Sequence, residues 1–117
     1  MRDIRAAAVA PRVAELAAAL HAACLQDGVK DAQAAYGELK TLGEDADLPA
    51  SVFDDMLALY GRLVMPGFAE GVFIDSLAAG HPPTEETCWA LLQIFERAGE
   101  STRAEKVLAY MESRGMS

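Results

Sequence analysis

Few residues of this chain could do chemistry, and their spacing does not bring them together. The two histidines, His21 and His81, share no metal-ligand spacing with each other or with the two cysteines, Cys24 and Cys88. His21 lies in an alanine-rich segment, which indicates a packing role, and His81 precedes two prolines in a predicted loop. The pattern predicts no metal and no cofactor.

The paired acids are equally unsuited to acid–base catalysis. Asp54 and Asp55, like Glu85 and Glu86, are adjacent in sequence, so on a helix their side chains point about 100° apart. Acids placed in this way are typical of the first turn of a helix. The sequence also has no glycine-rich phosphate loop, no Ser-His-Asp order and no zinc-binding helix motif. We therefore expect no catalytic residue and no enzyme.

The charge balance narrows the choice of partners. The chain has 10 Lys and Arg against 18 Asp and Glu, a net charge of −8. Such a surface repels phosphate backbones and anionic membranes at long range, although a local basic strip could survive it. No uninterrupted apolar run approaches the roughly 20 residues of a membrane span, and two widely spaced cysteines are typical of buried thiols in a reducing compartment.

The elements that position these residues repeat along the chain. Gly43, Gly80 and Gly115 each follow a helical pattern, at intervals of 37 and 35 residues, and glycine commonly closes a helix in the left-handed conformation. Seven residues before each glycine lies a large apolar side chain, and eleven before lies an alanine. These positions are Tyr36, Phe73 and Leu108, and Ala32, Ala69 and Ala104.

The first half of each unit repeats as well. Phe53, Met56, Leu57 and Tyr60 match Cys88, Leu91, Leu92 and Phe95, each displaced by 35 residues and spaced as one helical face. Turn residues separate the halves, which predicts helices over 12–26, 29–42, 50–63, 66–79, 85–98 and 101–114. A lone hairpin cannot bury both of its faces, so we expect an all-α, right-handed superhelix of stacked hairpins over residues 1–117, with units near 13–49, 50–84 and 85–117.

The third unit resembles the pentatricopeptide repeat family. The resemblance lies in the Ala98-Gly99 turn, the Ala104-Glu105 start of the second helix and the end from Met111 to Gly115. It covers nearly the whole chain, although the first unit is looser and two residues longer. The tetratricopeptide repeat is the rival, but it prefers glycine where Leu57 and Leu92 stand. The chain stops two residues short of a full third unit, as a piece of a longer array would.

The resemblance implies an RNA-binding protein of a mitochondrion or chloroplast that reads one base per repeat. The base-reading places of the family are the fifth residue of the first helix and the last residue of the repeat. They fall here on Ala17, Asp54 and Trp89, and on Asp47 and Thr84. Ala17 has no donor, Asp54 is charged like phosphate, and Trp89 could stack on a base without reading its edge. The ordinary code of the family fails.

Two functions therefore remain open. Arg62 and Arg97, 35 residues apart, occupy a place where the family often carries a basic residue near the RNA backbone, although ion pairs with neighbouring acids are the alternative. The hypothesis we favour is an accessory subunit that docks on a larger protein complex. Its expected docking residues are Val64 and Phe68 at an apolar corner and Tyr110 and Met116 at the end, whereas Met111 reads as core.

Overall fold

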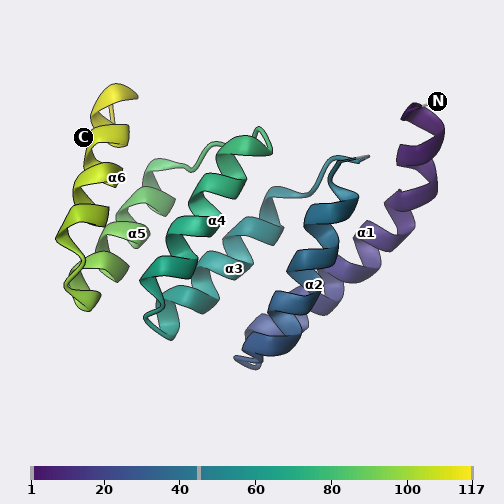
Figure 1. Ribbon diagram of the computed structural model, residues 1–117, viewed down its shortest axis with the longest axis horizontal. Coiled ribbons are helices and arrows are strands. Elements are labelled where there is room, and N and C mark those ends of the chain that lie inside the picture. Colours follow the sequence, from purple (N-terminus) through teal and green to yellow (C-terminus); the bar gives the residue numbers. More distant parts are fainter. Residues whose placement is uncertain (1, 45, 117) are drawn as a thin grey trace. The chain divides into compact units, whose positions relative to one another are not determined.

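The computed structural model describes residues 2–44 and 46–116, with side chains from residue 8 onward. The described residues form helices and no strand, which confirms the all-α class (Figure 1). The helices are α1 (Arg2–Leu25), α2 (Val29–Leu42), α3 (Ala50–Arg62), α4 (Pro66–Ala78), α5 (Glu85–Ala98) and α6 (Ser101–Ser113).

Helices α2 to α6 begin at the residues predicted from the sequence and end within one residue of the predicted ends. The first helix differs, because α1 begins at Arg2 and runs through Pro11, whereas we expected it to begin near residue 12. Proline removes one backbone hydrogen bond from a helix interior. The alanines on both sides of Pro11 favour the helix strongly enough to continue it across that gap.

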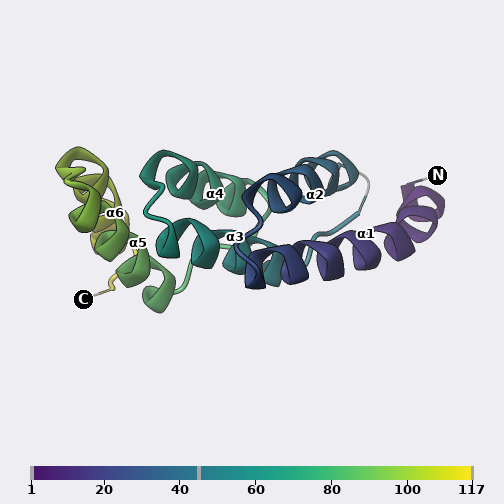
Figure 2. The same ribbon diagram turned by 90° about the horizontal axis from the view of Figure 1, so that it is seen from below.

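The chain divides into two compact units, Met1–Leu59 and Tyr60–Ser117, and the boundary falls inside α3. In the first unit α1 packs along α2 and buries an apolar stripe that includes Leu16 and Leu20 (Figure 2). The first turns of α3 join this core: the ring of Phe53 meets that of Tyr36 edge to face, with centroids 6.2 Å apart. At the edge, Arg12 of α1 pairs with Glu38 of α2 at 2.9 Å.

In the second unit α5 packs against both α4 and α6. Its apolar face is buried through Cys88, Leu91, Leu92 and Phe95, the stripe that the sequence pattern predicted. Each large apolar side chain of this kind contributes about 1.5–3 kcal/mol on full burial. Thr84 caps α5 as expected, because its hydroxyl oxygen accepts a hydrogen bond from the Thr87 amide at 3.2 Å.

The turns after α1, α3 and α5 have one design. Asp27, Val64 and Gly99 each adopt a positive φ, of 55°, 52° and 71°. The next amide in each turn then bonds the carbonyl five residues earlier: Gly28 to Ala23 at 2.8 Å, Met65 to Tyr60 at 2.9 Å and Glu100 to Phe95 at 2.8 Å. This is the hydrogen bond that closes a helix on a left-handed residue. The turn positions are 37 and 35 residues apart, the same intervals as the three glycines.

The glycines themselves behave less uniformly. Gly80 and Gly115 take positive φ values, as predicted, but Gly43 has a φ of −62° and continues the right-handed helix. The expectation of a left-handed stop at Gly43 was therefore wrong. Here glycine serves close approach, since an added Cβ would lie 3.1 Å from the Cδ1 atom of Leu48.

We predict that Gly99→Ala lowers the free energy of unfolding by about 1 kcal/mol, because an L side chain disfavours a φ of 71°. Gly71→Ala is the matched control: its Cβ would also meet nothing within 4 Å, but Gly71 lies inside α4. That variant should gain about 0.5–1 kcal/mol, since alanine favours helices. Urea unfolding of both variants measures the difference, and equal effects would contradict the left-handed turn.

Candidate interaction site

An exposed apolar group of the second unit lies where α3 turns into α4. We call Leu63, Val64 and Phe68 the α3–α4 corner. Leu63 and Val64 are each 38% exposed and Phe68 is 54% exposed. Pro66 begins α4, as expected, at a position where its missing N–H costs nothing. The predicted docking residues Val64 and Phe68 are thus both exposed near this turn.

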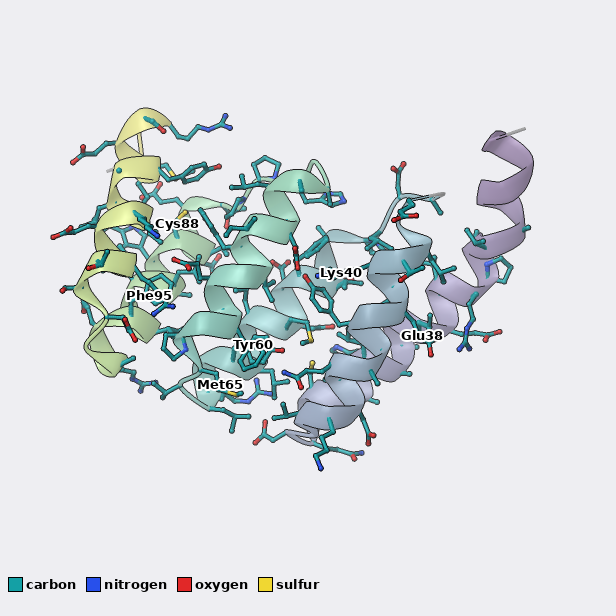
Figure 3. The ribbon with its side chains drawn as sticks, viewed as in Figure 1. Glu38, Lys40, Tyr60, Met65, Cys88 and Phe95 are labelled. Carbon is teal, nitrogen blue, oxygen red and sulfur yellow. The ribbon has the colours of Figure 1, made fainter. Side chains whose placement is uncertain are left out.

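The Phe68 side chain is held in place by a contact with a buried aromatic ring. Its ring stacks on the ring of the buried Tyr60, with centroids 5.4 Å apart and planes 24° apart. The Met65 amide bonds the Tyr60 carbonyl, and Figure 3 shows Tyr60 and Met65 together at this end of the two helices. One face of the Phe68 ring is therefore fixed by the protein, while the rest stays in contact with solvent. Aromatic side chains fixed in this way bind with little loss of rotamer freedom.

Val64 carries backbone strain. A β-branched residue with a φ of 52° is a true outlier, and the left-handed conformation costs an L residue about 1–2 kcal/mol. Glycine fills the equivalent place at position 99 without this cost. The apolar side chain at Val64 is thus kept at the expense of stability, and such strain is common at functional sites. Periodicity alone gave no sign of it.

The other two predicted docking residues do not join this corner. The Tyr110 ring of α6 meets Phe73 of α4 edge to face at 5.3 Å, so Tyr110 is half-buried inside the second unit and not part of an open patch. Its hydroxyl group is buried without a hydrogen-bond partner among the described residues. The Met116 amide closes α6 by bonding the Met111 carbonyl at 2.8 Å, and Met111 is core, as expected.

The residues at the base-reading places belong to both units. Asp47 and Asp54 are exposed in the first unit, and Trp89 is 46% exposed on α5. The Trp89 indole N–H points to the Glu85 carboxylate at 3.5 Å, which is a long contact. The Thr84 hydroxyl already accepts the helix-capping hydrogen bond. Of these residues, Trp89 is the one whose side chain could stack on a base.

Arg62 and Arg97 are both exposed, at the ends of α3 and α5. Asp55, an acid of the same helix as Arg62, lies 3.1 Å from the Nδ1 atom of His21. His21 is therefore exposed and paired, and the packing role predicted for it was wrong. The error arose because an alanine-rich helix leaves much of its surface open, which local sequence does not reveal.

Cys24 and Cys88 are buried thiols, as predicted. Burial, and after it the negative charge of Glu85, raise the pKa of the Cys88 thiol above its ordinary value of 9.0. A protonated thiol is a poor nucleophile and a poor metal ligand. Among the described residues no three His, Cys, Asp or Glu side chains are grouped so that they could hold a metal ion.

One segment of α1, Ala8–Leu25, is long and apolar enough to cross a membrane by length and composition alone. The charged residues Arg12 and Glu15 interrupt it, which is why the sequence shows no continuous apolar run of that length. Val13, Leu16 and Leu20 of this segment are buried in the first unit. A core helix and a signal sequence both pass the same test of length and composition, so the absence of a membrane span stays a prediction.

Fold and site together define an all-helical protein whose most exposed apolar side chains include a fixed aromatic ring. No family model, no curated protein and no solved structure matches the chain. The pentatricopeptide resemblance therefore depends only on the residues quoted for it above.

We predict that the buried Cys88 thiol makes stability fall at high pH. Its contribution is complete below pH 9.0, where the thiol is protonated in both states, and is lost as the pH rises toward the raised pKa of the folded state, because the unfolded chain ionises first. Between pH 7 and pH 10, the free energy of unfolding should fall more steeply for the wild type than for Cys88→Ala. Parallel slopes would contradict the shift.

Proposed function

We propose that this chain is a non-catalytic helical-repeat module that binds a larger protein complex as an accessory subunit. In this proposal its hairpins stack as a right-handed superhelix of the pentatricopeptide type. The resemblance also leads us to propose a mitochondrial or chloroplast location. The α3–α4 corner is the observation that carries the protein-binding function.

Contacts between alternate helices support stacked hairpins. In the first unit α1 reaches α3, since the Cys24 sulfur lies 4.0 Å from the Met56 sulfur. In the second unit α4 reaches α6 through Phe73 and Tyr110. Contacts from one hairpin to the same helix of the next are what a solenoid requires. The three equivalent turns at Asp27, Val64 and Gly99 support a repeated unit in the same way.

The chemistry of the α3–α4 corner favours a protein partner. An exposed aromatic ring that is fixed on one face, with aliphatic neighbours, matches the buried centre of a protein interface better than a polar ligand site. The strained Val64 keeps an apolar side chain where glycine would be more comfortable. The net charge of −8 also opposes nucleic acid as a general partner.

We predict that Phe68→Asp abolishes partner binding, because it places a charge in the centre of the corner. The tagged wild type should recover one complex in stoichiometric amount from an organellar extract, and the variant should recover at least about tenfold less. Ile74→Asp is the matched control, since Ile74 is 56% exposed on the same helix but outside the corner. Equal recovery with both variants would exclude the corner as the interface.

RNA binding is the alternative function, and the exposed Trp89 is the observation that favours it. We predict no tight binding of single-stranded RNA in anisotropy titrations at low salt, because the acidic surface repels phosphate. Tight binding with a steep salt slope, abolished by Arg62→Ala combined with Arg97→Ala, would contradict the protein-binding proposal. Leu25→Asp, at an exposed apolar residue of the first unit, controls for a general effect of surface substitution.

A further inference from the structure

The outer face of α6 displays an ordered set of side chains. Glu105, Leu108 and Glu112 are spaced i, i+3 and i+7, so they lie along one face of the helix. All three are exposed, and Leu108 is 44% exposed. A large aliphatic side chain between two carboxylates resembles a small docking face more than an ordinary solvated surface. We call these three residues the α6 outer face.

The opposite face of α6 is held by α4. Glu70 of α4 lies 3.4 Å from the Nε atom of Arg103 and 3.9 Å from the Nζ atom of Lys106. The contact with Arg103 Nε is electrostatic rather than a hydrogen bond, since that atom has no hydrogen-bond partner among the described residues. Beside these charges the Phe73 ring meets the Tyr110 ring at 5.3 Å. Glu70 of α4 thus pairs with two cations of α6, and Phe73 meets its aromatic ring. Arg103 also pairs with Glu100 at 2.9 Å.

The residues of α4 that hold α6 have counterparts on the α6 outer face. A step of 35 residues leads from Glu70 to Glu105 and from Phe73 to Leu108. It also leads from Leu77 to Glu112, which adds a second carboxylate. The α6 outer face therefore repeats, with more negative charge, the face with which α4 binds a helix in this same protein.

We propose that the α6 outer face binds a helix of a partner protein that presents basic, basic and aromatic side chains at positions i, i+3 and i+7. Arg103, Lys106 and Tyr110 of α6 have this spacing and are the chain's own example of such a helix. The carboxylate of Glu105, the counterpart of Glu70, receives the cations, and Leu108 packs against the ring. This inference rests on the proposed protein-binding function but uses a different surface from the α3–α4 corner.

A second copy of the chain does not supply this helix. The residues of α2 that are equivalent to Arg103, Lys106 and Tyr110 are Asp31, Ala34 and Glu38, all exposed. Two acids would meet Glu105 and Glu112, and like charges across an interface are unfavourable. The basic face of α6 in another copy is already engaged with Glu70 of α4. Charge therefore disfavours a second copy of this chain as the occupant.

The test uses the full chain and a fluorescein-labelled, stapled helical peptide with the sequence of residues 101–114. The staple is required because an isolated helix of about this length is marginal in water. Anisotropy titration at low salt should show saturable binding to the wild type. Leu108→Asp should weaken it at least about tenfold, and Glu105→Lys about threefold, the size expected for one exposed ion pair.

A charge exchange identifies the contact. A peptide in which both Arg103 and Lys106 are replaced by Glu should bind the wild type poorly and the Glu105→Lys protein better, because the attraction is restored with reversed signs. Leu25→Asp is the control variant, since it adds the same charge at an exposed apolar residue of α1. It should bind the peptide as the wild type does.

Each other outcome overturns the proposal. Equal binding by wild type and Leu108→Asp would mean that the peptide replaces α6 on α4. Absence of saturable binding, or self-association of the wild type that Leu108→Asp removes, would exclude a basic partner helix. The Phe68→Asp protein keeps the α6 outer face intact and should still bind the peptide. Peptide binding at the α6 outer face and partner binding at the α3–α4 corner are therefore tested separately.

Discussion

Two helices joined by a tight turn can bury only the surfaces that they present to each other, and the rest of their apolar stripes needs cover from elsewhere in the chain. This constraint governs both units of the protein. In the first, the α1–α2 pair is completed by Phe53 and Met56 of α3. In the second, α5 is covered by both α4 and α6, and its face from Cys88 to Phe95 disappears from solvent. Because α5 packs against helices on both sides, it needs apolar residues for two neighbours.

The turns meet the same requirement at different energetic cost. Gly99 adopts its left-handed conformation freely, whereas Asp27 and Val64 adopt theirs against the steric preference of an L residue. At Val64 the strained residue also carries an exposed side chain beside Phe68, so the least comfortable turn and the α3–α4 corner coincide. A position that sacrifices stability in order to keep an apolar surface residue is a better guide to function than exposure alone. For this reason the α3–α4 corner carries the proposed function, while Tyr110, which has found partners within the chain, does not.

The charged residues of α6 are separated by sign onto two faces of the helix. On α6, the basic residues Arg103 and Lys106 face the carboxylate of Glu70, and the acids Glu105 and Glu112 lie on the opposite side. The helix is therefore acidic on one face and basic on the other, within a chain whose net charge is −8. Polarity of this kind contributes little to stability at exposed positions, but it discriminates between partners by making the wrong ones repel.

The amino-acid sequence by itself determined the six helices, their boundaries after residue 29 and the apolar stripe of α5, because helix propensity, capping and periodicity act over a few residues. It could not determine that α1 continues through Pro11, that Gly43 stays right-handed beside Leu48, or that Asp27 and Val64 take the left-handed role of glycine. Nor could it place His21 against Asp55 or Tyr110 against Phe73. These outcomes depend on side chains that lie more than thirty residues away or on backbone angles that packing imposes, and both are properties of the assembled tertiary structure rather than of any short segment.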